Sequence, residues 1–435
     1  MLTQIAVFCR RFKMKKSTHS PFMILHKFSL FIIIVAFCLT AEAQTPAVSF
    51  YAKKGKGYGL VTSDSSFSLN FQFRMQNRAA FVSKETDDLA AESFEFRVRR
   101  LRLKFEGFVY DPRLTYYIQL SFSRGDMDWR GPENSAVNNS PNVVRDAVIY
   151  YNPTPALRLG FGQTKLPGNR QRVVSSGDQQ FADRSIVNAT FNIDRDFGFF
   201  AQFTQPYFIL KGAVTSGEGR NSLNSNSGLA YTGRVEILPF GSFTGSNDYI
   251  EGDLEREQSP KLSIGATYSL NDRARREAGQ LGNDIYSTTS INNFEFDALF
   301  KYNGFAFYNE FMQRDSPNPV TVDHDDPTRA RFIYNGTGFL SQMSYLFKNN
   351  VEIAGRYSRV TPSSDIYRNT GFEELVEEEK NGNRIEQIEA GVTKYLNGHR
   401  LKIQGNLIYN TQTLLIDDSD AGGFWSAIFQ VELGI

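Results

Sequence analysis

Cysteine is nearly absent from this sequence. Only two cysteines, Cys9 and Cys38, occur in 435 residues. Histidine is also scarce, and after residue 43 only His324 and His399 remain, each without neighbouring metal ligands. A cysteine–histidine metal site is therefore excluded there, and no Gly-x-Ser-x-Gly motif presents a nucleophile. We expect no metal, no cofactor and no enzyme activity.

Long apolar runs are lacking after residue 43, where none approaches the roughly 18 residues of a membrane-spanning helix. The one marked run, residues 28–39, is too short to span a bilayer. Six basic residues precede it and Ala41-Glu42-Ala43 follows it, an arrangement typical of a secretory signal peptide. We predict that residues 1–43 are removed; Met1 and Met14 are both candidate start sites.

The chain also lacks an excess of positive charge. It has 48 basic and 47 acidic side chains, and without residues 1–43 the balance is 42 to 46. A mildly acidic protein does not have the electrostatics of a general nucleic-acid binder. No nucleic-acid partner is expected.

The sequence does contain a repeated alternation of apolar and polar residues. In segment 67–76 the odd-numbered residues are apolar and the even-numbered ones are polar. A period of two predicts β-strands with one apolar face, and about ten residues is the length that a tilted strand needs to cross a bilayer. The same pattern recurs in segments 114–122, 262–268, 294–302, 401–409 and 425–435.

The connections between these segments alternate in length. Tight turns such as Asn303-Gly304 and Asn397-Gly398 alternate with long polar stretches such as 124–142, 166–194 and 361–383. This predicts an all-β protein: a transmembrane antiparallel β-barrel of about 16 strands, with short periplasmic turns and long extracellular loops, in the bacterial outer membrane. A soluble β-sandwich is the alternative, but sandwich strands are usually shorter and their turns do not alternate.

The predicted barrel spans residues 66–435, and residues 44–65 form a lead-in to it. The connection from Pro239 to Pro260 breaks the pattern, because it is long where a short turn is due. Three further motifs are assigned to no site. Asp323-His324-Asp325-Asp326 and the acidic run 373–380 are interpreted as solvated loops, and the glycine-rich segment 55–59, which no predicted strand precedes, as a flexible approach to the first strand.

Segment 94–107, FEFRVRRLRLKFEG, has many bases for a strand. Its apolar residues change parity across Arg99-Arg100, and a β-bulge there would keep all of them against lipid. Without the bulge, bases would face lipid at about 2–4 kcal/mol each near the midplane. The predicted lumen-facing bases are Arg97, Arg99, Arg100, Arg102 and Lys104, with Arg74 and Arg78 on the preceding strand and Arg158, Arg234, Arg356 and Lys402 elsewhere.

A lumen lined by arginine and lysine attracts anions, and guanidinium groups bind phosphate oxygens through two hydrogen bonds. We therefore predict passive diffusion of anions, with phosphate as the leading candidate. The alternative is that these bases only pair with acids such as Glu95 and Glu106, or with a loop folded into the barrel. The other functional hypotheses are a general or oligosaccharide diffusion porin, a barrel hydrolase, and an adhesive or structural barrel.

Several motifs together resemble the phosphate-selective porin O and P family. They occur in family order in the first half of the mature chain: Arg99-Arg100-Leu101-Arg102-Leu103, Val144-Arg145-Asp146-Ala147, Gly162-Gln163-x-Lys165-x-Pro167, Arg172-Val173-Val174-Ser175-Ser176, Asp183-Arg184 and Arg195-Asp196-Phe197-Gly198.

The resemblance implies a barrel of 16 strands, usually trimeric, surrounded by outer-membrane lipid and lipopolysaccharide. It also implies a third loop that folds into the lumen to form a narrow anion site. The matching positions are Arg99, Arg100, Arg172, Ser175 and Ser176. Arg172 stands where the family commonly has lysine, and the chain ends in Ile435 where barrels often end in phenylalanine.

Overall fold

A computed structural model describes residues 47–53, 57–123, 143–222, 228–367 and 382–435. The predicted signal peptide, the loop 124–142 and the acidic run 373–380 lie outside these residues. Among the described residues, no helix has the length and apolar character needed to cross a membrane. The fold below is that of the compact unit Val48–Ile435.

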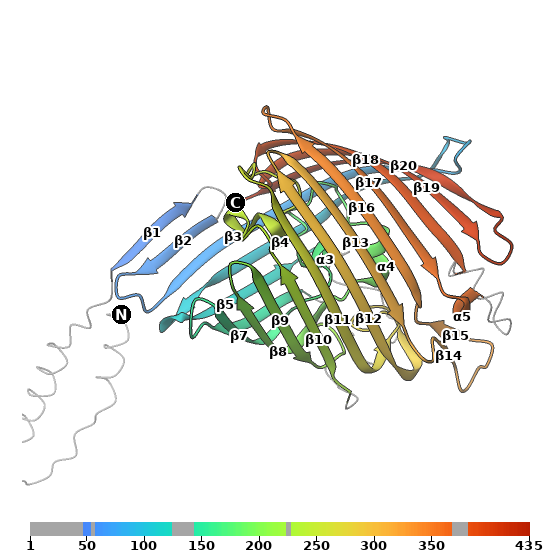
Figure 1. Cartoon of the computed structure of the whole chain (residues 1–435), viewed down its shortest axis with the longest axis horizontal. Helices are drawn as coiled ribbons and strands as arrows, with labels where there is room; N and C mark the ends of the chain where they lie inside the picture. Colours follow the sequence, from blue (N-terminus) through green and yellow to red (C-terminus); the bar gives the residue numbers. More distant parts are fainter. Residues whose placement is uncertain (1–46, 54–56, 124–142, 223–227, 368–381) are drawn as a thin grey trace, which may run out of the picture. The chain divides into compact units, whose positions relative to one another are not determined.

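The predicted barrel of 16 strands is confirmed. Neighbouring strands pair antiparallel in chain order, and the last strand pairs with the first, Ser426 opposite Val82 and Gly434 opposite Arg74, which closes the sheet. The strands run obliquely around the barrel (Figure 1). They are β3 (Ser68–Ser83), β4 (Ala91–Val109), β5 (Asp111–Ser121), β6 (Val144–Tyr151), β7 (Leu157–Lys165), β8 (Arg195–Thr204), β9 (Phe208–Thr215), β10 (Ala230–Ile237), β11 (Lys261–Arg276), β12 (Asp284–Tyr302), β13 (Phe305–Asp315), β16 (Gly336–Leu346), β17 (Val351–Pro362), β18 (Asn383–Asn397), β19 (Leu401–Leu414) and β20 (Asp420–Gly434).

The connections divide the barrel into a short-turn end and a long-loop end. Each of the six alternating segments of the sequence falls within a strand, to within one residue, but several strands exceed the expected length of about ten residues. β4 and β12 each have 19 residues. As a result the loop after β3 (84–90), the loop after β11 (277–283) and the loop after β19 (415–419) are shorter than long connections such as 166–194. A small hairpin, β14 (Val320–Val322) and β15 (Ala330–Phe332), lies in the loop between β13 and β16.

The expected lead-in contains a second hairpin. β1 (Val48–Lys53) pairs with β2 (Gly57–Thr62), and β2 pairs with the first residues of β3, Tyr58 opposite Phe71. β2 therefore extends the edge of β3 beyond the point where β20 stops, and the hairpin projects past the barrel (Figure 1). The expectation that no strand precedes the glycine-rich segment is wrong. A Cβ on Gly57 would lie 2.1 Å from the Phe71 carbonyl oxygen, so glycine permits this pairing.

The predicted β-bulge in β4 is confirmed. Gln76 of β3 lies opposite Arg100 and Asn77 lies opposite Val98, so Arg99 is the extra residue. Phe94, Phe96 and Val98 are exposed on the outer face of the barrel, on the side where Phe105 packs against Phe71.

Deletion of Arg99 should leave a regular strand, because Val98 would still face outward and Arg100 inward. We expect this variant to assemble like the wild type, as measured by the heat-dependent electrophoretic shift of folded barrels. Deletion of Leu103 in the same strand should turn Lys104 outward and Phe105 inward. We expect that variant to fail to assemble, because lysine near the midplane costs about 2–4 kcal/mol. Equal assembly of the two variants would contradict the bulge assignment.

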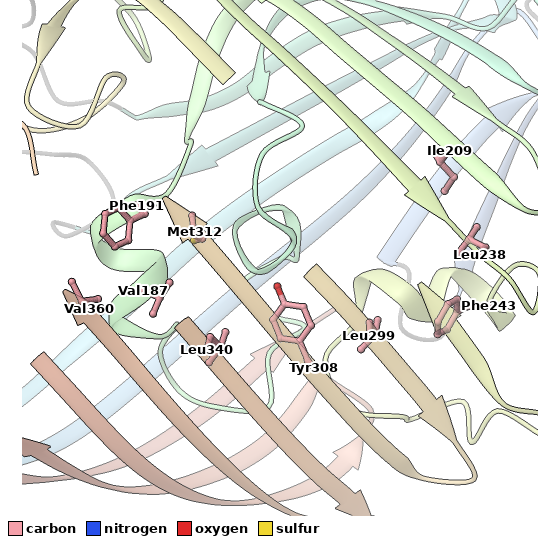
Figure 2. Close-up of a cluster of buried hydrophobic side chains, with 10 residues drawn as sticks. All are labelled: Val187, Phe191, Ile209, Leu238, Phe243, Leu299, Tyr308, Met312, Leu340 and Val360. Carbon is pink, nitrogen blue, oxygen red and sulfur yellow. The ribbon is translucent and has the colours of Figure 1, made fainter. Parts of the chain in front are cut away.

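The third loop (residues 166–194, between β7 and β8) folds into the barrel and packs on its inner wall. It carries α3 (Arg170–Val173) and α4 (Ile186–Phe191). Val187 and Phe191 of α4 belong to a buried apolar cluster with inward-facing residues of β13, β16 and β17 (Figure 2). The cluster consists of Val187, Phe191, Ile209, Leu238, Phe243, Leu299, Tyr308, Met312, Leu340 and Val360.

Two glycines make room for the third loop. A Cβ on Gly338 of β16 would lie 2.6 Å from Cγ1 of Val187, and one on Gly391 of β18 would lie 2.8 Å from the Phe181 ring. A larger residue at either position would push the loop off the wall. The loop is thus fixed by close packing as well as by polar contacts.

Candidate functional site

The two serines predicted for the anion site face the basic wall of β3 and β4. Nη1 of Arg74 donates to Oγ of Ser175 at 3.0 Å, and Nη2 donates to Oγ of Ser176 at 2.8 Å. Arg102 also donates to Ser176, at 2.9 Å. The serines therefore meet Arg74 and Arg102, which the sequence predicts only as bases of the wall.

A second contact, an ion pair at Asp183, anchors the third loop to the barrel wall. Arg78 contacts the Asp183 carboxylate at 2.6 Å, and Arg99, the bulge residue, contacts it at 3.4 Å. Burial alone would raise the pKa of Asp183, but Arg78 and then Arg99 outweigh it and hold that pKa well below its usual value. Asp183 therefore stays ionised at neutral pH, and the anchor weakens only in strong acid.

Arg172 lies at a separate part of the loop. Its guanidinium pairs with Asp194, which also contacts Arg195 at 3.4 Å. Arg100 is buried and donates to Oε1 of Gln76 at 2.9 Å. The five predicted site residues thus hold different partners: Ser175 and Ser176 accept from Arg74 and Arg102, Arg99 pairs with Asp183, Arg100 donates to Gln76 and Arg172 pairs with Asp194.

The other bases predicted to line the wall differ in their exposure. Arg97 is exposed and pairs with Glu95 at 2.6 Å, and Lys104 pairs with Glu106 at 3.0 Å. Arg158 is exposed, donates to Oδ1 of Asn152 at 3.0 Å and lies 5.1 Å from the Tyr150 ring centre. Both acids expected as alternative partners, Glu95 and Glu106, therefore do pair with bases.

Three further predicted bases are covered by the third loop or by neighbouring carboxylates. Arg234 is buried and contacts Asp297 at 2.6 Å. Arg356 donates to the backbone carbonyl of Asp183 at 3.1 Å, and Lys402 donates to that of Gly177 at 3.1 Å. All three are buried, so they stabilise the packing inside the barrel and do not face water.

A group of bases beside α3 was not predicted as a site. Nζ of Lys165 donates to the carbonyl oxygen of Val173 at 2.6 Å, and Arg184 donates to the carbonyl oxygens of Gln171 and Val174 at 2.8 Å each. Burial, and then the positive charge of the neighbouring Arg172, lowers the pKa of Arg184 well below its usual value. Lys165 and Arg184 already stood in the motifs of the resemblance, which was the available signal.

The long connection between β10 and β11, residues 238–260, folds into the barrel from the short-turn end. It contains the 3₁₀ helix η3 (Thr244–Tyr249). Lys301 of β12 is fully buried and donates to the backbone carbonyls of Asn247 and Ile250 at 2.6 and 2.7 Å. Asp253 accepts the backbone N–H of Gly304 at 2.7 Å. The inward-facing side chains below the connection are thereby withdrawn from water.

The connection and the third loop meet inside the lumen. The backbone N–H of Glu251 donates to the Asp178 carbonyl at 2.8 Å, and the Glu251 carboxylate accepts the backbone N–H of Gln180 at 3.1 Å. Arg170 of α3 donates to the Asp248 carbonyl at 3.0 Å. Two segments that enter from opposite ends are thus joined, and they close the lumen in front of β11–β20.

The residues that make this closure were missed by sequence reasoning. Glu251, Asn247 and Asp253 sit in a connection that was recognised only as too long for a turn. Among the described residues, no group of three or more histidines, cysteines and carboxylates is placed to hold a metal ion, and segment 323–326 lies in the exposed β14–β15 turn.

Comparisons with known proteins agree with this architecture. An anion-selective porin from Comamonas acidovorans is similar in structure, with a TM-score of 0.52, 11% identity, and coverage of 85% of this chain and 100% of that one. Outer-membrane expressed OmpT of Vibrio cholerae is also similar in structure, with a TM-score of 0.50 and 10% identity. The match covers 86% of this chain and 100% of the OmpT chain. At such identity the likeness shows the fold alone.

No curated protein matches the sequence significantly. The sequence profile described as phosphate-selective porin O and P matches residues 69–413. This range covers the barrel strands from β3 to β19, short of one residue at each end, and leaves out β20. The chain is therefore an outer-membrane β-barrel that belongs to the phosphate-selective porin O and P family.

Proposed function

We propose that this outer-membrane porin gives passive, anion-preferring diffusion, with phosphate as the leading solute. The observation that carries the proposal is the group of bases beside α3. The carboxylates of Asp146 and Asp194 are bonded to Arg195 and Arg172, whereas Lys165 and Arg184 donate to backbone carbonyls. Among these six groups bases therefore outnumber carboxylates by four to two, and an anion that enters offsets the burial and the repulsion that lower the pKa of Arg184, which favours anions in a water-filled passage.

The wall bases add to this field at both ends of the passage. Arg97 and Arg99 lie toward the long-loop end, and Lys104 and Arg158 toward the short-turn end. An anion entering past the loops would meet Arg99 and Arg172 beside the third loop. It would leave past Lys104 and Arg158, and no energy input is needed for this route.

Phosphate is favoured as the solute by the abundance of guanidinium groups, which bind phosphate oxygens in pairs. The family name supports the same choice. The general diffusion porin remains the second candidate, because Arg74, Arg78 and Arg102 are held by the third loop. The absence of enzyme activity, the homotrimer and the contacts with lipid and lipopolysaccharide stay predictions.

Reversal potential tests the proposal directly. Purified protein in a planar bilayer, under a gradient of potassium chloride, should give a zero-current potential with the sign of the chloride equilibrium potential. Addition of phosphate should reduce the chloride current, because phosphate occupies the same bases for longer. A potential near zero would favour the general diffusion porin, and one of the opposite sign would exclude anion preference.

A further inference from the structure

We propose that the lumen holds a binding chamber for organic anions that combine an anionic group with an aromatic ring, such as phosphate monoesters of aromatic alcohols. The inference rests on the proposed anion preference and names its substrate class more narrowly. The chamber lies below the third loop, on the side of β4–β10 that the closure described above leaves open. Its volume is about 580 Å³, and Lys165 borders it.

The size of the chamber exceeds what inorganic phosphate requires. Cavities of about 300–1,000 Å³ are the usual sites of organic ligands, which they bind mainly through apolar and aromatic side chains. A channel specific for a small inorganic ion would need only a narrow ring of donors. The volume therefore admits a solute that has an organic body as well as a charged group.

The walls of the chamber supply aromatic surfaces. Tyr117 and Tyr150 face it from β5 and β6, and Phe108 and Phe200 from β4 and β8. The ring of Tyr150 lies against Gly160 of β7, where a Cβ would meet it at 2.8 Å. The third loop adds Leu166, Pro167 and Val173 as a roof. A planar ring could thus be covered by protein on several sides.

Cations stand beside these rings. Nζ of Lys104 lies 5.3 Å from the centre of the Tyr117 ring, and the Arg158 guanidinium lies 5.1 Å from that of Tyr150. Lys165 lies below these loop residues. Its ammonium group has three N–H donors, and one of them is used in the hydrogen bond to Val173, so the others can bind a ligand. Aromatic surface and positive charge therefore alternate around the same space.

The two acids that line the chamber are already paired with bases other than Lys165 and Arg158. Asp146 accepts two hydrogen bonds from Arg195, at 2.9 and 3.2 Å. Glu106 pairs with Lys104 at 3.0 Å. Lys165 and Arg158 thus remain to hold an anionic group, and the rings hold the rest of the ligand.

Block of the chloride current in planar bilayers tests this chamber with three probes: phenyl phosphate, inorganic phosphate and phenol. Phenyl phosphate should reach half-block at about one tenth of the concentration of inorganic phosphate, because burial of one ring adds roughly this factor. Phenol, which has the ring without the charge, should not block. Equal half-block by the two phosphates, or block by phenol, would overturn the proposal.

Variants locate the effect. Tyr150→Ser should bring the half-block concentrations of the two phosphates together, and Lys165→Met should raise both. Lys394→Met, which removes a base near the short turns outside the chamber, should change neither. An unchanged ratio in Tyr150→Ser would overturn the assignment, and if that variant does not assemble, the wild-type comparison decides alone. Loss of anion preference in the reversal potential would instead overturn the proposed function, so the two failures are distinguishable.

Discussion

Replacement of residues 241–260 by Asn-Gly should raise the single-channel conductance severalfold. In the pairing of β10 with β11, Ile237 lies opposite Ile264. If this register continued, Phe240 would lie opposite Lys261, and a two-residue turn would join them. The replacement removes Glu251 and the η3 helix, which join the third loop inside the lumen. Lys301 and His399 would then face water, and the cross-section open to ions would increase.

A matched excision controls for the loss of residues. Replacement of 323–329 by Asn-Gly shortens the exposed turn between β14 and β15, where Val322 pairs with Ala330. This variant should keep the wild-type conductance, because the turn lies outside the lumen. If both variants assemble and both conduct like the wild type, the connection does not limit the passage. Greater current noise in the first variant alone would further support its contact with the third loop.

The double variant Arg99→Ala and Arg100→Ala should lower the chloride-to-potassium permeability ratio about tenfold. At roughly 12 Å from a passing ion in water, each charge favours chloride and disfavours potassium by about 0.35 kcal/mol, so two charges change the ratio by about 1.4 kcal/mol. Arg99 is one fifth exposed and shares Asp183 with Arg78, so its removal also leaves that carboxylate with one fewer cation. The ratio follows from reversal potentials measured under a salt gradient.

The control for this variant removes the same charge away from the passage. Arg113 and Arg273 are exposed near the two rims and pair with Asp111 and Asp272. The variant with alanine at both positions should keep the wild-type ratio. Should the Arg99 and Arg100 variant also keep it, while assembling normally, these two side chains would have only a structural role at the bulge.

The barrel could be predicted from the sequence because a strand of a membrane barrel has one apolar face, which contacts lipid. That constraint repeats every second residue, so the alternation in 67–76 and in 425–435 predicted β3 and β20 without knowledge of their neighbours. The bulge at Arg99 was predictable for the same reason, since a change of parity among Val98, Leu101 and Leu103 has one inexpensive repair. Strand lengths were less certain, because β4 and β12 continue beyond the bilayer, where no lipid restricts them.

The contents of the lumen depended on contacts between segments far apart in the chain. Nothing local pairs Ser176 with Arg102, Asp183 with Arg78, or Glu251 with Gln180, because each contact requires that two segments first enter a closed barrel. Inward-facing apolar residues such as Met312 and Leu340 break the expected polar parity only because α4 packs on them. The sequence by itself determined the barrel and the bulge of β4. Only the tertiary structure decided which bases the third loop holds and which side of the lumen stays open, because those depend on packing across the lumen and not on the alternation along a strand.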